Sequence, residues 1–142
     1  MDNYEYYGLF LTQESKDKLA KWLFFNGYSP ESELIKKRTG WYLDYCTLLH
    51  KSQRDDYGLI RNTLDSIFNL YGQTKRLIVI DGIGQSDKAI AFRVSNLAGL
   101  CANKIPHITI CTFNDGKPVD SNYITKWKNI ETIVVEAKLE KR

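Results

Sequence analysis

The spacing of apolar residues changes along the chain, and each spacing predicts a different element. Residues 4–11 read Y-E-Y-Y-G-L-F-L and are rich in aromatic and aliphatic side chains, which is typical of a strand. Thr12 then stands where an N-cap is favoured, before a helix that ends at Asn26 and Gly27. The apolar side of this helix comprises Leu19, Trp22, Leu23 and Phe25.

After a polar connection, the same kind of pattern predicts further strands and helices. The strands are expected at residues 41–51, 77–84, 88–94, 105–113 and 131–139. The helices are expected at residues 55–71, 95–103 and 120–127. Neighbouring strands adjoin through short turns rather than through long helices, which favours an α+β fold over a doubly wound parallel sheet.

The composition is that of an ordinary globular protein. With 142 residues, a single domain spanning residues 1–142 is expected. Hydrophobic residues make up 43% of the chain and charged residues 26%. The net charge is +3 and the basic residues are dispersed, so the charge permits an anionic ligand without requiring one.

The cysteines and the hydropathy predict a compartment. Cys46, Cys101 and Cys111 have no C-x-x-C spacing, so we expect reduced thiols and neither a disulfide framework nor a zinc site. No apolar run approaches the roughly 20 residues that a membrane helix needs. The acidic, tyrosine-rich start is unlike a signal peptide. A cytoplasmic protein that does not bind membranes is therefore expected.

The predicted strand around P-H-I-T-I-C-T carries a polar pair on one face. Because side chains alternate along a strand, His107 and Thr109 point the same way. In an earlier predicted strand, Tyr45 and Thr47 have the same spacing, about half the chain away. The frames Y-C-T-L and H-I-T-I therefore indicate an internal pseudo-repeat.

These frames carry a family resemblance. A His-x-Thr strand in each half of an α+β chain resembles the two-histidine (2H) phosphoesterase superfamily. Its members include cyclic phosphodiesterases, RNA-repair domains of tRNA ligases and phage nucleases that degrade cyclic oligonucleotides. The likeness covers Y-Y-G-L-F-L, L-D-Y-C-T-L-L-H-K-S-Q, I-D-G-I-G-Q-S-D-K-A-I-A-F-R-V, P-H-I-T-I and G-K-P-V-D-S-N-Y-I-T-K-W. It implies a bilobal fold, in which two pseudo-repeated antiparallel sheets line a central cleft and the helices lie outside.

The resemblance also implies a phosphodiesterase that needs no metal and no cofactor. Its ligand would be a cyclic phosphate, or a nucleotide or oligonucleotide phosphodiester such as an RNA end. Two imidazoles can divide the work of general base and general acid near neutral pH. Threonine hydroxyls can hydrogen-bond the non-bridging phosphate oxygens. The catalytic candidates are then His107, Thr109, Thr47 and Tyr45.

Tyr45 departs from the family pattern, which has a histidine at this position. A phenol has a pKa of about 10, so it is a poor base at pH 7, although it can donate a hydrogen bond or act as an acid. His50 does not simply replace the missing histidine, because it points to the opposite face of a regular strand. Only a β-bulge between Tyr45 and His50 would bring the imidazole to the same face.

Alternatives stay open for the function and for the remaining candidates. Because of Tyr45, the chain could instead be a catalytically impaired protein that binds a nucleotide, a cyclic oligonucleotide or an RNA end, or an interaction domain. Resemblance to the family suggests substrate binding by Tyr7, Ser121 and Trp127. Tyr7 could equally pack in the core, and Ser121 could only cap a helix.

Overall fold

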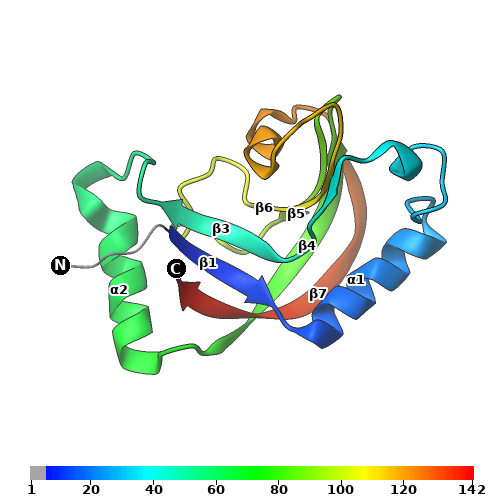
Figure 1. The fold of residues 1–142 in the computed structure, drawn as a ribbon. Helices are drawn as coiled ribbons and strands as arrows, with labels where there is room; N and C mark the ends of the chain where they lie inside the picture. The colour runs from blue at the N-terminus through cyan, green and yellow to red at the C-terminus, as the bar shows by residue number, and fades with distance from the viewer. Residues whose placement is uncertain (1–5) are drawn as a thin grey trace.

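The computed structural model describes residues 6–142, and most of them lie in strands and helices (Figure 1). The strands are β1 (Tyr6–Leu11), β2 (Gly40–Trp41), β3 (Tyr45–His50), β4 (Lys75–Gln85), β5 (Ala89–Val94), β6 (His107–Thr112) and β7 (Trp127–Lys141). The α-helices are α1 (Gln13–Phe25) and α2 (Leu59–Tyr71). Three short 3₁₀ helices are η1 (Ile35–Lys37), η2 (Asp56–Gly58) and η3 (Pro118–Tyr123).

Six of the strands close into one antiparallel barrel. Their order is β6-β3-β1-β7-β4-β5, and a further pairing between β5 and β6 closes the sheet. Both β2 and β3 pair with the same side of β6, one after the other along its length. Cys46 of β3 is opposite Ile108, and Trp41 of β2 is opposite Cys111. Every strand pair in the described chain is antiparallel.

The expectation of a bilobal fold with two sheets around a central cleft is wrong. The reason is the length of β4 and β7, which have 11 and 15 residues. At one end β7 pairs with β1, and along the rest of its length it pairs with β4, which in turn pairs with β5. These two strands therefore join what would have been separate sheets into a single closed one (Figure 1).

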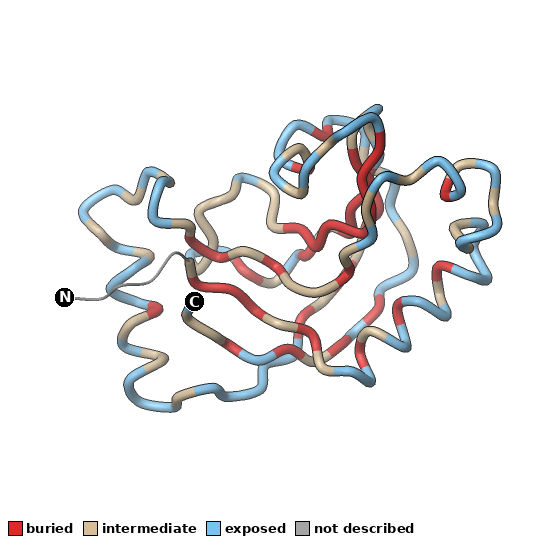
Figure 2. Tube along the Cα trace, in the orientation of Figure 1, coloured by how far each residue is buried: buried red, intermediate tan, exposed pale blue. Residues whose placement is uncertain are grey.

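The hydrophobic core fills the inside of the barrel. Alternate residues of all six barrel strands join one buried cluster, which includes Leu9, Cys46, Ile80, Phe92, Ile108 and Val135. A set of side chains contributed by every strand of a closed sheet can meet only in its interior. Figure 2 shows the buried residues concentrated along the strands, whereas α1 and α2 are exposed over much of their surface.

The two α-helices add their apolar faces to this core. Leu19 and Leu23 of α1 are fully buried, and Trp22 meets the ring of Phe92 edge-on. On α2, Leu64 is buried in the same cluster. As predicted, Thr12 caps α1, because its hydroxyl accepts a hydrogen bond from the backbone N–H of Ser15 at 3.2 Å.

Two of the predicted short helices are wrong. Residues 95–103 form turns, and Gly99 adopts a positive φ of 80° that an α-helix does not allow. The segment predicted as a helix at residues 120–127 instead contains the end of η3 and the start of β7. Pro118, which fixes its own φ, begins η3. Both segments border the pocket described next.

Candidate active site

Both histidines of the chain line one pocket on the outer wall of the barrel. The pocket has a volume of about 300 Å³ and opens over β3 and β6. The loop after β3 and the helix η3 form its sides. The lining residues are Tyr42, Asp44, Tyr45, Thr47, His50, Ser52, Gln53, Asn103, His107, Thr109, Pro118, Val119 and Asn122. The structure thus brings together all four predicted catalytic residues, and adds His50.

The pairing of β3 with β6 explains how the two sequence frames meet. Cys46 is opposite Ile108, and both side chains point into the core. Their neighbours therefore point outward, with Thr47 beside His107 and Tyr45 beside Thr109. Side chains that face each other in this way have Cβ atoms about 4.5–5.5 Å apart.

A β-bulge in β3 carries His50 to the pocket side. Gly8 of β1 is opposite Thr47, but Tyr7 is opposite Leu49, so Leu48 has no partner of its own in β1. Leu48 and Leu49 are consecutive and both buried, at 1% and 3% exposure. The extra residue reverses the alternation that follows it. His50 therefore lies on the same face as Tyr45. The sequence allowed this arrangement only if a β-bulge lay between the two residues.

His107 is held as a neutral imidazole. Its Nδ1 lies 2.9 Å from the carbonyl oxygen of Ile105, which can only accept, so Nδ1 carries the proton. Burial lowers the pKa of His107 below its usual 6.5, although the bond to Ile105 partly opposes the change. At pH 7 the Nε2 atom therefore keeps its lone pair, which is the state that a general base needs.

His50 is held in the opposite tautomer. The backbone N–H of Ser52 donates to its Nδ1 at 3.1 Å, so in the neutral ring the proton is on Nε2. The Ser52 hydroxyl is 2.7 Å from the same Nδ1 atom. This hydroxyl can donate to the neutral ring and accept from the protonated one. The two histidines thus present one Nε2 acceptor and one Nε2–H donor.

Polar contacts from two loops fix the position of His50. Its backbone N–H donates to Gln53 Oε1 at 2.8 Å, and Gln53 Nε2 donates to Asn103 Oδ1 at 2.6 Å. The backbone N–H of Ala102 donates to the carbonyl of Leu48, the bulged residue, at 2.7 Å. The loop between β5 and β6 therefore hydrogen-bonds to the part of β3 that does not pair with β6.

The two threonines differ in what their hydroxyls can still do. Thr109 donates to the carbonyl of Pro118 at 3.2 Å and lies 2.8 Å from the Ser121 hydroxyl. Its proton is therefore committed to holding η3. The Thr47 hydroxyl makes no hydrogen bond with another residue of the described chain. Of the two predicted phosphate contacts, Thr47 is the one with a donor available.

Tyr45 belongs to an aromatic cluster on the outer face of β1 and β3. Its ring lies 5.0 Å from Phe10 and 5.6 Å from Tyr6, measured between centroids. Burial, followed by the neighbouring Tyr6 and Asp44, raises the pKa of Tyr45 above its usual 10.0. Tyr45 is therefore protonated at neutral pH. It can donate a hydrogen bond to a ligand, but it cannot serve as the general base.

The pocket contains little formal charge. In residues 6–142, no lysine or arginine lines it, and Asp44 is its one acidic residue. Asp44 pairs with Lys16 at 3.1 Å. On the neighbouring strand β5, Arg93 is opposite His107. Any anion in the pocket would therefore be held by neutral donors and histidine rather than by a cluster of cations.

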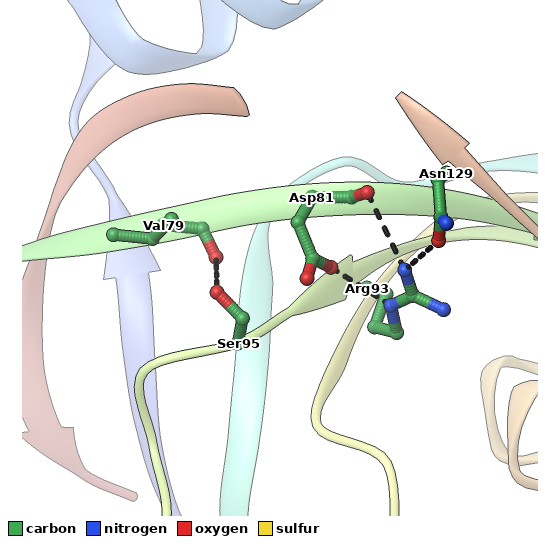
Figure 3. Close-up of polar contacts among 5 residues, drawn as sticks. All are labelled: Val79, Asp81, Arg93, Ser95 and Asn129. Atoms are coloured by element: carbon green, nitrogen blue, oxygen red, sulfur yellow. Dashed lines mark hydrogen bonds and ion pairs between the residues drawn. The ribbon is translucent and has the colours of Figure 1, made fainter. Parts of the chain in front are cut away.

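Arg93 is committed to other partners, as Figure 3 shows. Its Nε donates to Asp81 Oδ1 at 2.8 Å, and its Nη2 donates to Asn129 Oδ1 at 2.6 Å. A side chain at Gly82 would meet the guanidinium at 2.8 Å, so this glycine makes room for it. Arg93 thus ties β5 to β4 and β7 next to the pocket. Figure 3 also shows Ser95, whose hydroxyl donates to the carbonyl of Val79 at 3.4 Å.

The three residues predicted to bind substrate lie outside the pocket lining. Tyr7 is fully buried in the barrel, and its hydroxyl donates to Asp65 Oδ1 on α2. Ser121 is buried behind Thr109, where it supports η3. Trp127 packs against Ala89 and Ala91 at the start of β7. Each of them has a structural role here, and their contact with a ligand stays a prediction.

The sequence placed His50 at the site only if a β-bulge preceded it, and it did not predict several of the polar lining residues. For His50 the signal was present, because two adjacent leucines interrupt the alternation of β3 just before it. Gln53, Asn103 and Asn122 come from separate loops, and nothing in their local sequence marks them. In the described chain, no group of three or more His, Cys, Asp or Glu residues is placed to bind a metal. None of its helices has the length and apolar character needed to cross a bilayer.

Comparison with solved structures shows a shared fold. No protein-family model matches the sequence, and no curated protein matches it significantly. A fungal RNA kinase of known crystal structure superimposes on 97% of this chain with a TM-score of 0.63 and 15% sequence identity. The chain spans 45% of that protein, so the likeness concerns a part of the larger molecule. At this identity the match establishes the architecture alone.

Proposed function

We propose that this protein is a metal-independent phosphodiesterase that acts on a cyclic phosphate or on a nucleotide or oligonucleotide phosphodiester. One observation carries the proposal. The chain has 2 histidines among its 142 residues, and both line the same pocket together with the available Thr47 hydroxyl. Random placement would rarely bring the only two imidazoles to one site in complementary tautomers.

In this proposal the histidines divide the proton transfers. His107 accepts a proton through Nε2 from water or from a ribose 2′-hydroxyl, because its Nδ1 is already protonated. His50 in its protonated form gives a proton to the leaving oxygen, while Ser52 accepts from its Nδ1. Thr47 and Tyr45 donate hydrogen bonds to the non-bridging oxygens, which gain negative charge in the transition state.

The ligand class is inferred from the fold. The solved structure of similar fold is an RNA kinase, so RNA ends are the first substrates to test. We do not extend kinase activity to this chain, because the sequence has no G-x-x-x-x-G-K-[ST] phosphate loop. Gly82 and Gly84 lie within β4, where they pair with β5 instead of cradling a phosphate.

Hydrolysis without metal is the test. The purified chain is incubated in EDTA with 2′,3′-cyclic nucleotides, RNA with a 2′,3′-cyclic end and cyclic oligonucleotides. We expect turnover of at least one substrate, and its loss in His107→Ala. Tyr71→Phe serves as the matched control, because this residue is 69% exposed on α2 and does not line the pocket. Turnover that His107→Ala leaves unchanged would overturn the proposal.

A second candidate function is binding of the same ligands without cleavage. The absence of lysine and arginine from the pocket lining, among the described residues, favours it, because transition-state charge would lack a cation. Calorimetry with the same panel, followed by chromatography of the ligand after long incubation, separates the two functions. Bound ligand recovered intact identifies a binding protein.

A further inference from the structure

Two of the three cysteines are neighbours directly behind the pocket. Cys101, in the loop between β5 and β6, donates from Sγ to the carbonyl oxygen of Thr47 at 3.3 Å. Cys46, in β3, donates from its own Sγ to the same oxygen at 3.9 Å. The two thiols therefore converge on one carbonyl, although they are far apart in the sequence. Both are free cysteines.

The two thiols differ in access to solvent. Cys46 is completely buried inside the barrel, whereas Cys101 is partly exposed on the loop. The neighbouring Cys46 thiol lowers the pKa of Cys101 despite the burial of Cys101, and the Cys101 thiol together with burial raises the pKa of Cys46. A thiol that is reachable and more readily ionised is the one that reacts first with an oxidant. A buried thiol next to it can resolve the product.

Cys111 provides an internal contrast. It is buried in β6, opposite Trp41 and Ile90, and burial raises its pKa to about 12. It has no exposed sulfur to meet an oxidant and remains a thiol at neutral pH. The chain thus contains two neighbouring thiols that are arranged to react and one that is not.

We propose that Cys101 is a site of oxidation by hydroperoxides, and that Cys46 resolves the oxidised sulfur to form a reversible Cys46–Cys101 disulfide. The Cys101 thiolate attacks one peroxide oxygen, the O–O bond breaks, and an alkoxide or hydroxide leaves. The resulting sulfenic acid is attacked by Cys46, the S–S bond forms, and the sulfenic oxygen departs as water. Two thiols lose two electrons, which reduce one hydroperoxide.

The disulfide would act on the same loop that holds His50. Forming it removes the Cys101 thiol from the Thr47 carbonyl, and Thr47 is a pocket residue. The next two residues after Cys101 hold the bulge of β3 and, through Gln53, the backbone of His50. The modification does not depend on the proposed phosphodiesterase activity, but it adjoins that pocket.

Mass spectrometry of the full chain tests the proposal. The protein is treated with equimolar hydrogen peroxide, alkylated and digested. We expect a linked Cys46–Cys101 peptide, the loss of two hydrogens per chain, Cys111 still alkylated, and complete reversal by dithiothreitol. A disulfide that includes Cys111, linkage only between chains, or alkylation of all three cysteines would each overturn the proposal.

Variants identify the order of the two steps. In Cys46→Ala the reaction should stop at a Cys101 sulfenic acid, which dimedone traps. In Cys101→Ser no dimedone adduct and no disulfide should form, and Cys111→Ser should behave like the unmodified chain. If Cys46→Ala does not fold, the wild-type peptide map decides alone. Dimedone labelling of Cys46 in Cys101→Ser would contradict the assignment of the reactive sulfur.

Discussion

The two strands that form the floor of the pocket, β3 and β6, each bring one histidine to its surface, but by different routes. In β6 the residues from His107 to Thr109 are opposite consecutive residues of β5, so His107 and Thr109 point outward by the ordinary alternation of a strand. In β3 the corresponding place is occupied by Tyr45, and a bulge later in the strand turns His50 outward instead. The histidine of β6 is therefore the first residue of its H-I-T-I frame, whereas the histidine of β3 lies five residues after Tyr45, the first residue of the Y-C-T-L frame.

The difference extends to how each imidazole is held. His107 is 8% exposed and donates to the backbone of its own strand entry, whereas His50 is half-buried and accepts from the loop that follows it. The first is fixed by the barrel wall and the second by loop contacts. A site can therefore contain two complementary nitrogens at unequal positions of its two strands, provided that a local irregularity turns one of the side chains outward.

The largest expected effect on activity comes from replacing His107 of β6. His107→Ala should lower kcat/KM for the best metal-free substrate by about 10²–10⁴, because a positioned general base is lost. His107→Asn can still donate to the Ile105 carbonyl and should lose as much activity. Unfolding by urea, measured on both variants, separates lost chemistry from lost structure. Normal stability with normal activity would show that His107 is not the base.

His50→Ala should have the next largest effect, a loss of about 10² in kcat/KM, at the lower end of the range for acid–base groups. Tyr45→Phe removes only a hydrogen-bond donor, so it should cost less than about tenfold. The comparison of these two variants decides which residue of β3 acts as the partner of His107. A larger loss in Tyr45→Phe than in His50→Ala would assign that role to Tyr45.

The threonines should separate binding from stability. Thr47→Val should weaken ligand binding by roughly 10–100-fold, as expected for loss of a hydrogen bond to a charged group worth about 1.5–3 kcal/mol, and leave the free energy of unfolding unchanged. Thr109→Val should lower that free energy by about 1–3 kcal/mol, because Ser121 and Pro118 lose their partner. Calorimetry and urea unfolding measure the two effects. Equal behaviour of both variants would remove the distinction between them.

The smallest expected effect is the pH dependence of stability from His107. Its pKa is lowered in the folded state, so the unfolded chain binds a proton first as the pH falls. The contribution is complete above the unfolded value of 6.5 and is lost as the pH falls toward the folded value. His107→Gln should therefore flatten the decline in unfolding free energy between pH 7 and pH 5. An unchanged slope would mean that His107 titrates normally.

Much of the local structure followed from the pattern of residues, but the closure of the barrel did not. The capped helix α1, most of the strands and the shared outward face of His107 and Thr109 depend on neighbours a few positions apart. The single strand predicted at residues 41–51 was wrong, because Leu43 adopts a positive φ of 55° and divides it into β2 and β3. The pairing of β7 with both β1 and β4 depends on residues far apart in the chain. Hydropathy alone gives no sign that β7 begins as early as Trp127.

The candidate site shows the same division. The pairs Tyr45 with Thr47 and His107 with Thr109 were each placed correctly on one face, since alternation fixes the faces of residues two positions apart. The face of His50 depended on whether the repeated leucines Leu48 and Leu49 formed a bulge, which the register against β1 decides. The loss of the free hydroxyl of Thr109 to Pro118 depends on how η3 folds back, and no local pattern encodes that.

The most direct test of the two-imidazole site is a double-mutant cycle on His50 and His107. Single-turnover rates in EDTA are measured for the wild type, His50→Ala, His107→Ala and the double variant, with the same phosphodiester substrate. If the two rings act on one bond as a unit, the double variant should lose little more than His107→Ala alone. A rate in His50→Ala equal to that of the wild type, with the whole loss in the double variant due to His107, would contradict it.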